Sequence, residues 1–170
     1  METSAHEFDI GVDGQAVSFS HSELQALRHT ADGSAPAVYV LRDQVSILYV
    51  GESPNGLVRP MTGLKIGYAQ SSAYRWRRDA DLRNTRIECL VFGLEPDFKN
   101  CRERRALEAE IAVAIRWRTG AWPRKMTEIH FSELLRHGAS VVDAQKLIIG
   151  ELVRRAWIPD SELSQRLTNG

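Results

Sequence analysis

Two tyrosines in the first third of the chain have the type and spacing of residues that could carry out proton chemistry. Tyr39 ends the run Ala37-Val38-Tyr39, and Tyr49 begins the run Tyr49-Val50-Gly51. Both runs are rich in β-branched residues, and polar residues 42–44 lie between them, which is typical of a hairpin of two buried strands. A hairpin would place the two phenol groups on neighbouring strands, where each can donate or accept a hydrogen bond.

Charge is distributed unevenly along a chain whose formal net charge is zero. Residues 1–58 carry two basic side chains against eight acidic ones, whereas residues 59–86 carry seven basic against two acidic. Residues 99–125 carry eight basic against three acidic. The two basic blocks could form a phosphate-binding surface or could be the solvated faces of helices, and the sequence leaves both alternatives open.

The elements that would position these residues follow from hydrophobic spacing and from turn signals. Ser20 and Glu23 have the spacing of a helix start, and the Gly-, Pro- and Ser-rich residues 52–72 predict a long connection of functional type. The remaining expected elements are a hairpin at 6–20, a helix at 72–84, a strand at 87–93, a helix at 102–118, a short strand at 129–131 and a helix at 140–157. This order predicts an α+β fold with a small sheet covered by helices.

At 170 residues the chain has the length of one ordinary domain. We expect an N-terminal extension over 1–35, a core domain over 36–125 and a helical extension of that domain over 126–170. No apolar stretch is long enough to cross a bilayer, and the polar N-terminus does not have the pattern of a secretory signal. With only Cys89 and Cys101, we expect two reduced thiols in a cytoplasmic protein without a membrane partner.

Residues 37–123 resemble the GIY-YIG nuclease family. The resemblance depends on Tyr39, on Tyr49-Val50-Gly51, on a downstream arginine and on the helical pair Leu107-Glu108, in that order. Ala37 stands where the family motif has its first glycine. The resemblance implies a three-stranded antiparallel sheet flanked by helices, and an endonuclease that hydrolyses phosphodiester bonds in DNA, with RNA as a further possible substrate.

The resemblance also implies roles for single residues. Tyr39 would act as the general base toward the attacking water, and Tyr49 would orient the water or the scissile phosphate. Arg59 would contact the phosphate oxygens, although Arg75 or Arg77 would take this role if residues 52–72 contain an insertion. Glu108 would be the ligand of Mg²⁺ or Mn²⁺.

Several positions complete this prediction or leave alternatives open. Glu110 lies at a similar angle to the apolar stripe of its helix and is the second candidate for the metal ligand. Arg124 follows Trp122-Pro123 at the position where the family has a supporting asparagine. The further nucleic-acid contacts would come from Lys65, Arg75, Arg77 and Arg78. The alternatives to a nuclease are a related module that binds nucleic acid without cutting it, and a scaffold domain.

Overall fold

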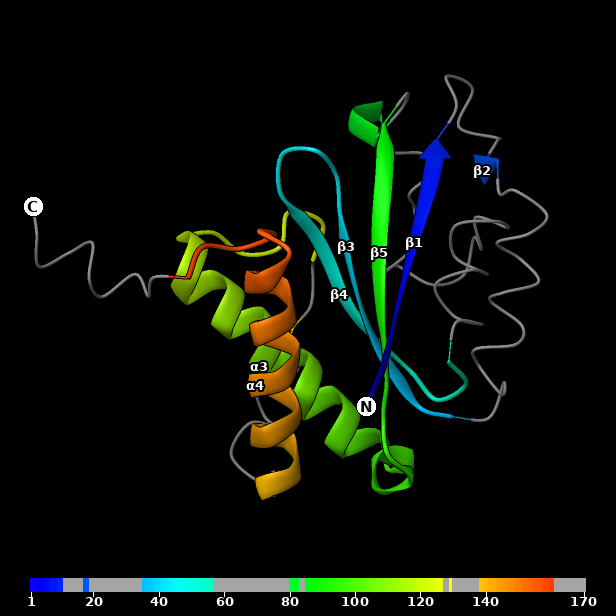
Figure 1. Cartoon of the computed structure of the whole chain (residues 1–170), viewed down its shortest axis with the longest axis vertical. Coiled ribbons are helices and arrows are strands. Elements are labelled where there is room, and N and C mark those ends of the chain that lie inside the picture. Colours follow the sequence, from blue (N-terminus) through cyan, green and yellow to red (C-terminus); the bar gives the residue numbers. More distant parts are fainter. Residues whose placement is uncertain are drawn as a thin grey trace, which may run out of the picture.

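An antiparallel sheet with two long helices beside it forms the structure, which is a computed structural model (Figure 1). It describes residues 1–10, 17–18, 35–56, 80–82, 85–126, 129 and 138–160. The arrangement is a small α+β fold, as the order of elements predicts.

The sheet has five strands in the order β2-β1-β5-β3-β4, and the neighbouring pairs are antiparallel. The strands are β1 (Glu2–Ile10), β2 (Val17–Ser18), β3 (Ala37–Arg42), β4 (Ile47–Ser53) and β5 (Arg86–Gly93). The three-stranded antiparallel sheet that the resemblance implies is present as β5-β3-β4, and two strands from the N-terminal residues extend it. Strand β1 pairs with the other side of β5 and satisfies backbone groups that would otherwise form an exposed edge.

The tyrosine hairpin forms as the sequence predicts. Strand β3 pairs with β4, and the register shifts between Leu41 and Arg42, where the ladder is irregular. The turn is closed by the carboxylate of Asp43, which accepts hydrogen bonds from the backbone N–H groups of Val45 and Ser46 at 2.9 and 2.8 Å. Hydrogen bonds that an aspartate carboxylate accepts from the backbone N–H groups following it stabilise a tight turn.

Both faces of β3 and β4 are buried, which explains why residues 37–41 and 47–50 are all apolar or aromatic. Val38, Val40 and Val50 belong to the main core on one face. Tyr39 and Leu41 alternate with them and are fully buried on the opposite face. Successive residues of these strands thus pack on opposite faces of the sheet.

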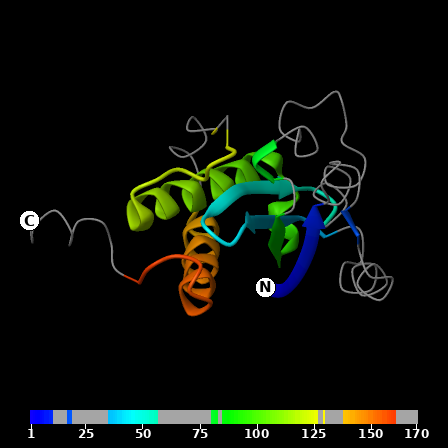
Figure 2. The same cartoon turned by 90° about the horizontal axis from the view of Figure 1, so that it is seen from above.

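Two helices complete the main core. Helix α3 (Cys101–Thr119) begins where the Asn100 side chain accepts a hydrogen bond from the Arg102 N–H, and it ends at Gly120, whose φ of 80° is left-handed. Helix α4 is Ala139–Arg154. Helix α3 lies beside β4 and α4 packs against α3 (Figures 1 and 2). Both helices lie close to the predicted ranges.

Other predicted elements differ from the structure or fall outside it. The expected helix at 72–84 is described only from residue 80, where Ala80–Leu82 form a 3-10 helix, and a second 3-10 helix spans Pro96–Lys99. The helix expected from Ser20 lies outside the described residues, as does the strand expected at 129–131 except for Ile129, which is not in a strand. None of the described helices is long and apolar enough to span a membrane.

Candidate active site at the tyrosine pair

The two motif tyrosines are in direct contact. Tyr39 on β3 lies opposite Gly51 on β4, and Tyr49 shares the same face of β4 because it is two residues away from Gly51. The two phenol rings are stacked, with their centroids 6.1 Å apart and their planes inclined by 29°. The hairpin register therefore brings together three residues that the sequence presents in two separate runs.

Gly51 is required for this packing. A Cβ atom added at Gly51 would lie 2.4 Å from both Cζ and Oη of Tyr39 and 2.6 Å from Cε1 of Tyr49. Real Cβ atoms do not approach other atoms so closely, so any larger residue would displace the tyrosine rings. The glycine of the Tyr-Val-Gly run thus leaves the space in which the Tyr39 ring lies.

The Tyr39 hydroxyl is the most unusual group of the site. Its oxygen is buried, and it has no hydrogen-bond partner within the described part of the chain. A buried hydroxyl without a partner costs about 1–3 kcal/mol, so such groups are uncommon unless they serve a further purpose. Tyr49 is slightly more exposed than Tyr39, and both rings are buried.

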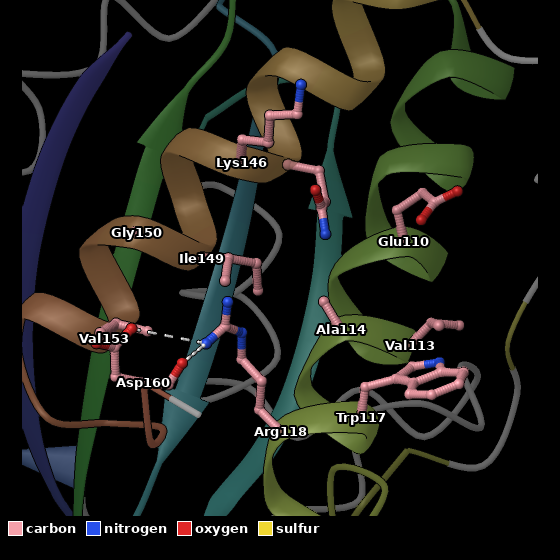
Figure 3. Close-up of a pocket in the computed structure, with 11 residues that line it drawn as sticks. Glu110, Val113, Ala114, Trp117, Arg118, Lys146, Ile149, Gly150, Val153 and Asp160 are labelled. Atoms are coloured by element: carbon pink, nitrogen blue, oxygen red, sulfur yellow. Dashed lines mark hydrogen bonds and ion pairs between the residues drawn. The ribbon is translucent and has the colours of Figure 1, made fainter. Parts of the chain in front are cut away.

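Glu108 and Glu110 lie on different sides of α3. Glu108 is 8% exposed and lies one turn after Arg104, so the two share one row of the helix. Arg104 reaches β4, where its Nε donates to Glu52 at 2.7 Å, so this row of α3 faces β4 on the side that Glu52 shares with Val50, opposite to Tyr49. Glu110 instead lines a groove between α3 and α4 (Figure 3). The structure thus separates two carboxylates that helical spacing alone did not distinguish.

The groove between α3 and α4 has a volume of about 590 Å³. Trp117 forms part of its wall and is 56% exposed, so this tryptophan is not a core residue (Figure 3). At one end of the groove, Arg118 donates a hydrogen bond of 2.6 Å to the backbone carbonyl of Asp160. The groove lies on the α3–α4 side and contains none of the described residues of the tyrosine pair.

The ion pair of Arg104 with Glu52 was not foreseen from the sequence. Both side chains are buried, and Arg104 also donates to the backbone carbonyls of Phe98 and Lys99 at 2.7 and 2.6 Å. The sequence did contain a signal, because Glu52 directly continues a buried strand and a charged residue there needs a partner. The sequence pattern around Glu52 could not predict that its partner is Arg104, because the two residues are 52 positions apart.

The second basic block is less available for phosphate than its composition suggests. Four of its eight basic side chains pair with acids from other parts of the chain. These pairs are Arg104 with Glu52, Arg118 with Asp160, Arg124 with Asp43, and Lys125 with Asp81. The block is therefore in large part a set of structural contacts.

Arg124 stands where the resemblance places a supporting asparagine, and it has a different role. Its side chain pairs with Asp43 in the turn between β3 and β4, and its backbone N–H donates to the carbonyl of Ile47 at 3.0 Å. The neighbouring Lys125 N–H donates to the carbonyl of Leu48 at 2.8 Å. This segment therefore holds the hairpin from one end.

Arg59 and its alternatives Arg75 and Arg77, as well as Lys65 and Arg78, lie outside the described residues. Among the candidate catalytic residues the structure thus describes Tyr39, Tyr49 and Glu108. The first two are in contact, and the third lies on the helix beside their hairpin.

A metal site that uses one carboxylate would have Glu108 as its protein ligand. Mg²⁺ is commonly bound by one or two carboxylates together with waters and substrate phosphates, and Glu108 supplies a carboxylate of this kind. Within the described ranges there is no cluster of three or more His, Cys, Asp or Glu side chains that could hold a metal.

No protein-family model, no curated protein and no solved structure matches the chain. The resemblance to the GIY-YIG nucleases therefore depends on the residues of this chain alone.

Proposed function

We propose that the protein is a metal-dependent endonuclease that hydrolyses phosphodiester bonds in DNA. One observation carries this proposal: Tyr39 and Tyr49 stack over Gly51, and the Tyr39 hydroxyl is buried without a partner among the described residues. A buried hydroxyl kept at a cost in stability is better explained by chemistry than by packing.

The two tyrosines would have different roles toward the attacking water. Tyr39 would accept the proton of the water as general base, which requires nearby positive charge because the reference pKa of tyrosine is about 10. Tyr49 would orient the water or the phosphate through its hydroxyl. Arg59, or Arg75 or Arg77 in its place, would bind two phosphate oxygens with its guanidinium group.

Glu108 would hold the divalent cation, Mg²⁺ or Mn²⁺. When bound, this ion would stabilise the negative charge that develops on the phosphate and on the leaving oxygen. The position of Glu108 on the row of α3 that faces β4 supports its choice over Glu110, which lines the groove on the α3–α4 side.

A cleavage assay with matched variants tests the proposal. The protein is incubated with single- and double-stranded DNA and RNA in Mg²⁺, in Mn²⁺ and in EDTA. We expect cleavage of DNA that EDTA abolishes and that falls by at least about 100-fold in Tyr39→Phe and in Glu108→Gln. Glu110→Gln is the control on the same helix and should retain activity. Cleavage by Glu108→Gln together with loss in Glu110→Gln would show that the ligand assignment is wrong.

A second function, binding of nucleic acid without cleavage, is favoured by a different observation. The Tyr39 side chain is fully buried, and the position expected to support the active site is occupied by Arg124, which pairs with Asp43. In this case the protein would bind the same nucleic acids, with an affinity that falls steeply as the salt concentration rises. It would cleave none of them under any metal condition.

A further inference from the structure

A second cavity, of about 450 Å³, lies at the C-terminal end of α4 and contains three arginines. Arg42 enters it from the end of β3, and Arg154 and Arg155 enter it from the end of α4. Because Arg42 is an odd number of residues away from Tyr39 on the same strand, it lies on the face opposite to the tyrosine pair. This cavity is therefore separate from the candidate active site.

The arginines have more hydrogen-bond donors than their partners use. Arg42 donates through Nε to Glu88 at 2.5 Å, and Arg155 donates through Nε to Glu151 at 2.6 Å. Arg154 uses Nε and Nη2, again toward Glu151. Each guanidinium carries five N–H donors, so several donors on each arginine bind no acceptor within the described ranges.

The charges at this cavity favour an anion. Among the side chains that the structure describes here, three guanidinium groups face two carboxylates, those of Glu88 and Glu151, which leaves one positive charge in excess. Hydrogen bonds from Arg154 and then Arg155 lower the pKa of Glu151 to about 2, so it stays ionised at neutral pH and holds both arginines in place.

Local structure also fixes the orientation of these side chains. The Arg42 guanidinium lies over the Trp157 ring, 4.6 Å from its centroid, which restricts the plane of the guanidinium group. Between Arg155 and Trp157 lies Ala156, which has a left-handed φ of 56° and is the only non-glycine residue with a positive φ in the described part of the chain. The turn at Ala156 therefore directs both neighbours toward the cavity.

We propose that this cavity binds the phosphoryl group of a phosphate monoester. A planar carboxylate is matched by one guanidinium fork, whereas a tetrahedral phosphate presents several oxygens and can accept from guanidinium groups on different sides. The cavity is larger than a phosphate ion needs, and Leu90 and Trp157 give it apolar wall for the organic part of the ester. This site goes beyond the proposed endonuclease activity and does not depend on it.

Calorimetric titration of the full chain with four probes tests the proposal. The probes are inorganic phosphate, adenosine 5′-monophosphate, adenosine, and an oligonucleotide prepared with and without a 5′-phosphate. We expect phosphate and the monophosphate to bind and adenosine not to bind. Preference for the free nucleotide would indicate a small-molecule ligand, whereas a preference for the 5′-phosphorylated oligonucleotide would indicate a nucleic-acid end.

The variants make the result specific to this cavity. The double variant Arg154→Gln/Arg155→Gln should weaken the binding of inorganic phosphate by at least about tenfold, and because both residues are on the surface it should fold, as circular dichroism would verify. Lys146→Gln removes one positive charge from the other groove of the same helix and should leave binding unchanged. The proposal would be overturned if the protein did not bind inorganic phosphate at about 10 mM phosphate. It would also be overturned if Lys146→Gln weakened phosphate binding as much as the double variant does.

Discussion

At the scale of single residues, Tyr39 and Gly51 depend on each other. The ring of Tyr39 lies where a Cβ at Gly51 would be, and its hydroxyl is buried without a partner among the residues that the structure describes. The first fact explains why the strand contains a glycine, and the second shows that the ring is not optimised for stability alone. Each fact leads to a prediction that separates packing from chemistry.

Gly51→Ala should destabilise the protein by at least about 2 kcal/mol, because the added methyl group overlaps the rings of Tyr39 and Tyr49, which are buried and cannot easily move. Equilibrium denaturation by urea, with the same m-value for both proteins, measures the difference. Gly150→Ala is the matched control. Apart from the backbone of its own helix, no atom of the described residues lies within 4 Å of its added Cβ, so this change should instead stabilise the protein by about 0.5–1 kcal/mol.

Tyr39→Phe should raise the free energy of unfolding by about 1 kcal/mol while it abolishes cleavage, because it removes a buried hydroxyl that has no partner in the described structure. Denaturation curves and the cleavage assay are measured on the same preparation. A loss of stability would show instead that the hydroxyl makes a favourable interaction, and the argument for a catalytic Tyr39 would then lose its main support.

At the scale of elements, the C-terminal end of α4 combines strain with charge. The N–H groups of Ala156 and Trp157 donate to the carbonyls of Val153 and Leu152 at 2.8 and 2.9 Å, the pattern of a Schellman motif. Such a motif normally has glycine at the left-handed position, where this chain has Ala156. Glu151 lies one turn earlier and binds the two arginines that follow.

Ala156→Gly should stabilise the protein by about 0.5–1 kcal/mol, because a left-handed alanine costs about 1–2 kcal/mol, and the greater freedom of glycine in the unfolded chain offsets part of that gain. The shift in thermal midpoint measures the effect. Ala144→Gly, in the interior of the same helix, should have the opposite sign. Destabilisation by Ala156→Gly would show that the left-handed turn is not strained.

Glu151→Gln should lower stability at neutral pH by less than about 1 kcal/mol, since the pairs are close to the surface. The pKa of Glu151 is lowered from 4.5 to about 2 by its hydrogen bonds to Arg154 and Arg155. The stabilisation is therefore complete above about pH 4.5 and is lost as the pH falls toward 2. Stability curves of the two proteins should converge over this range, and a constant difference would contradict the prediction.

At the scale of the whole molecule, one buried ion pair links the sheet to α3. Glu52 on β4 and Arg104 on α3 are 52 residues apart, and both are buried. Strand β1 makes a second long-range connection, because it pairs with β5 along most of its length. The hairpin that carries the tyrosines is thus held by contacts with distant parts of the chain.

Arg104→Met should destabilise the protein by about 3–5 kcal/mol, because it removes the guanidinium group that pairs with the buried Glu52 carboxylate. The double variant Glu52→Gln/Arg104→Met should lose less than the sum of the single changes, since the buried charge is removed with its partner. A double-mutant cycle by urea denaturation measures this coupling. A coupling energy below about 0.5 kcal/mol would show that the two sites act independently.

Local pattern was sufficient for much of the fold and for part of the site. The tyrosine hairpin, α3 and α4 follow from the spacing of apolar residues and from turn and cap residues, which act within a few positions of the chain. The hairpin register, and hence the contact between Tyr39 and Tyr49, was not predicted, because the ladder shifts between Leu41 and Arg42. By itself, then, the sequence determined the tyrosine hairpin, the two long helices and the candidate tyrosine pair.

Only the tertiary structure decided which distant segments meet. The five-stranded sheet, the burial of Glu52 with Arg104, the separation of Glu108 from Glu110 and the three arginines at the end of α4 all depend on such encounters. The spacing of apolar residues cannot predict these encounters. It indicates which face of a helix or strand is buried, but not which other element covers that face. A buried charged group needs an oppositely charged or hydrogen-bonding partner. The charged groups that remain available to a ligand are therefore determined by this pairing in the folded structure and not by composition.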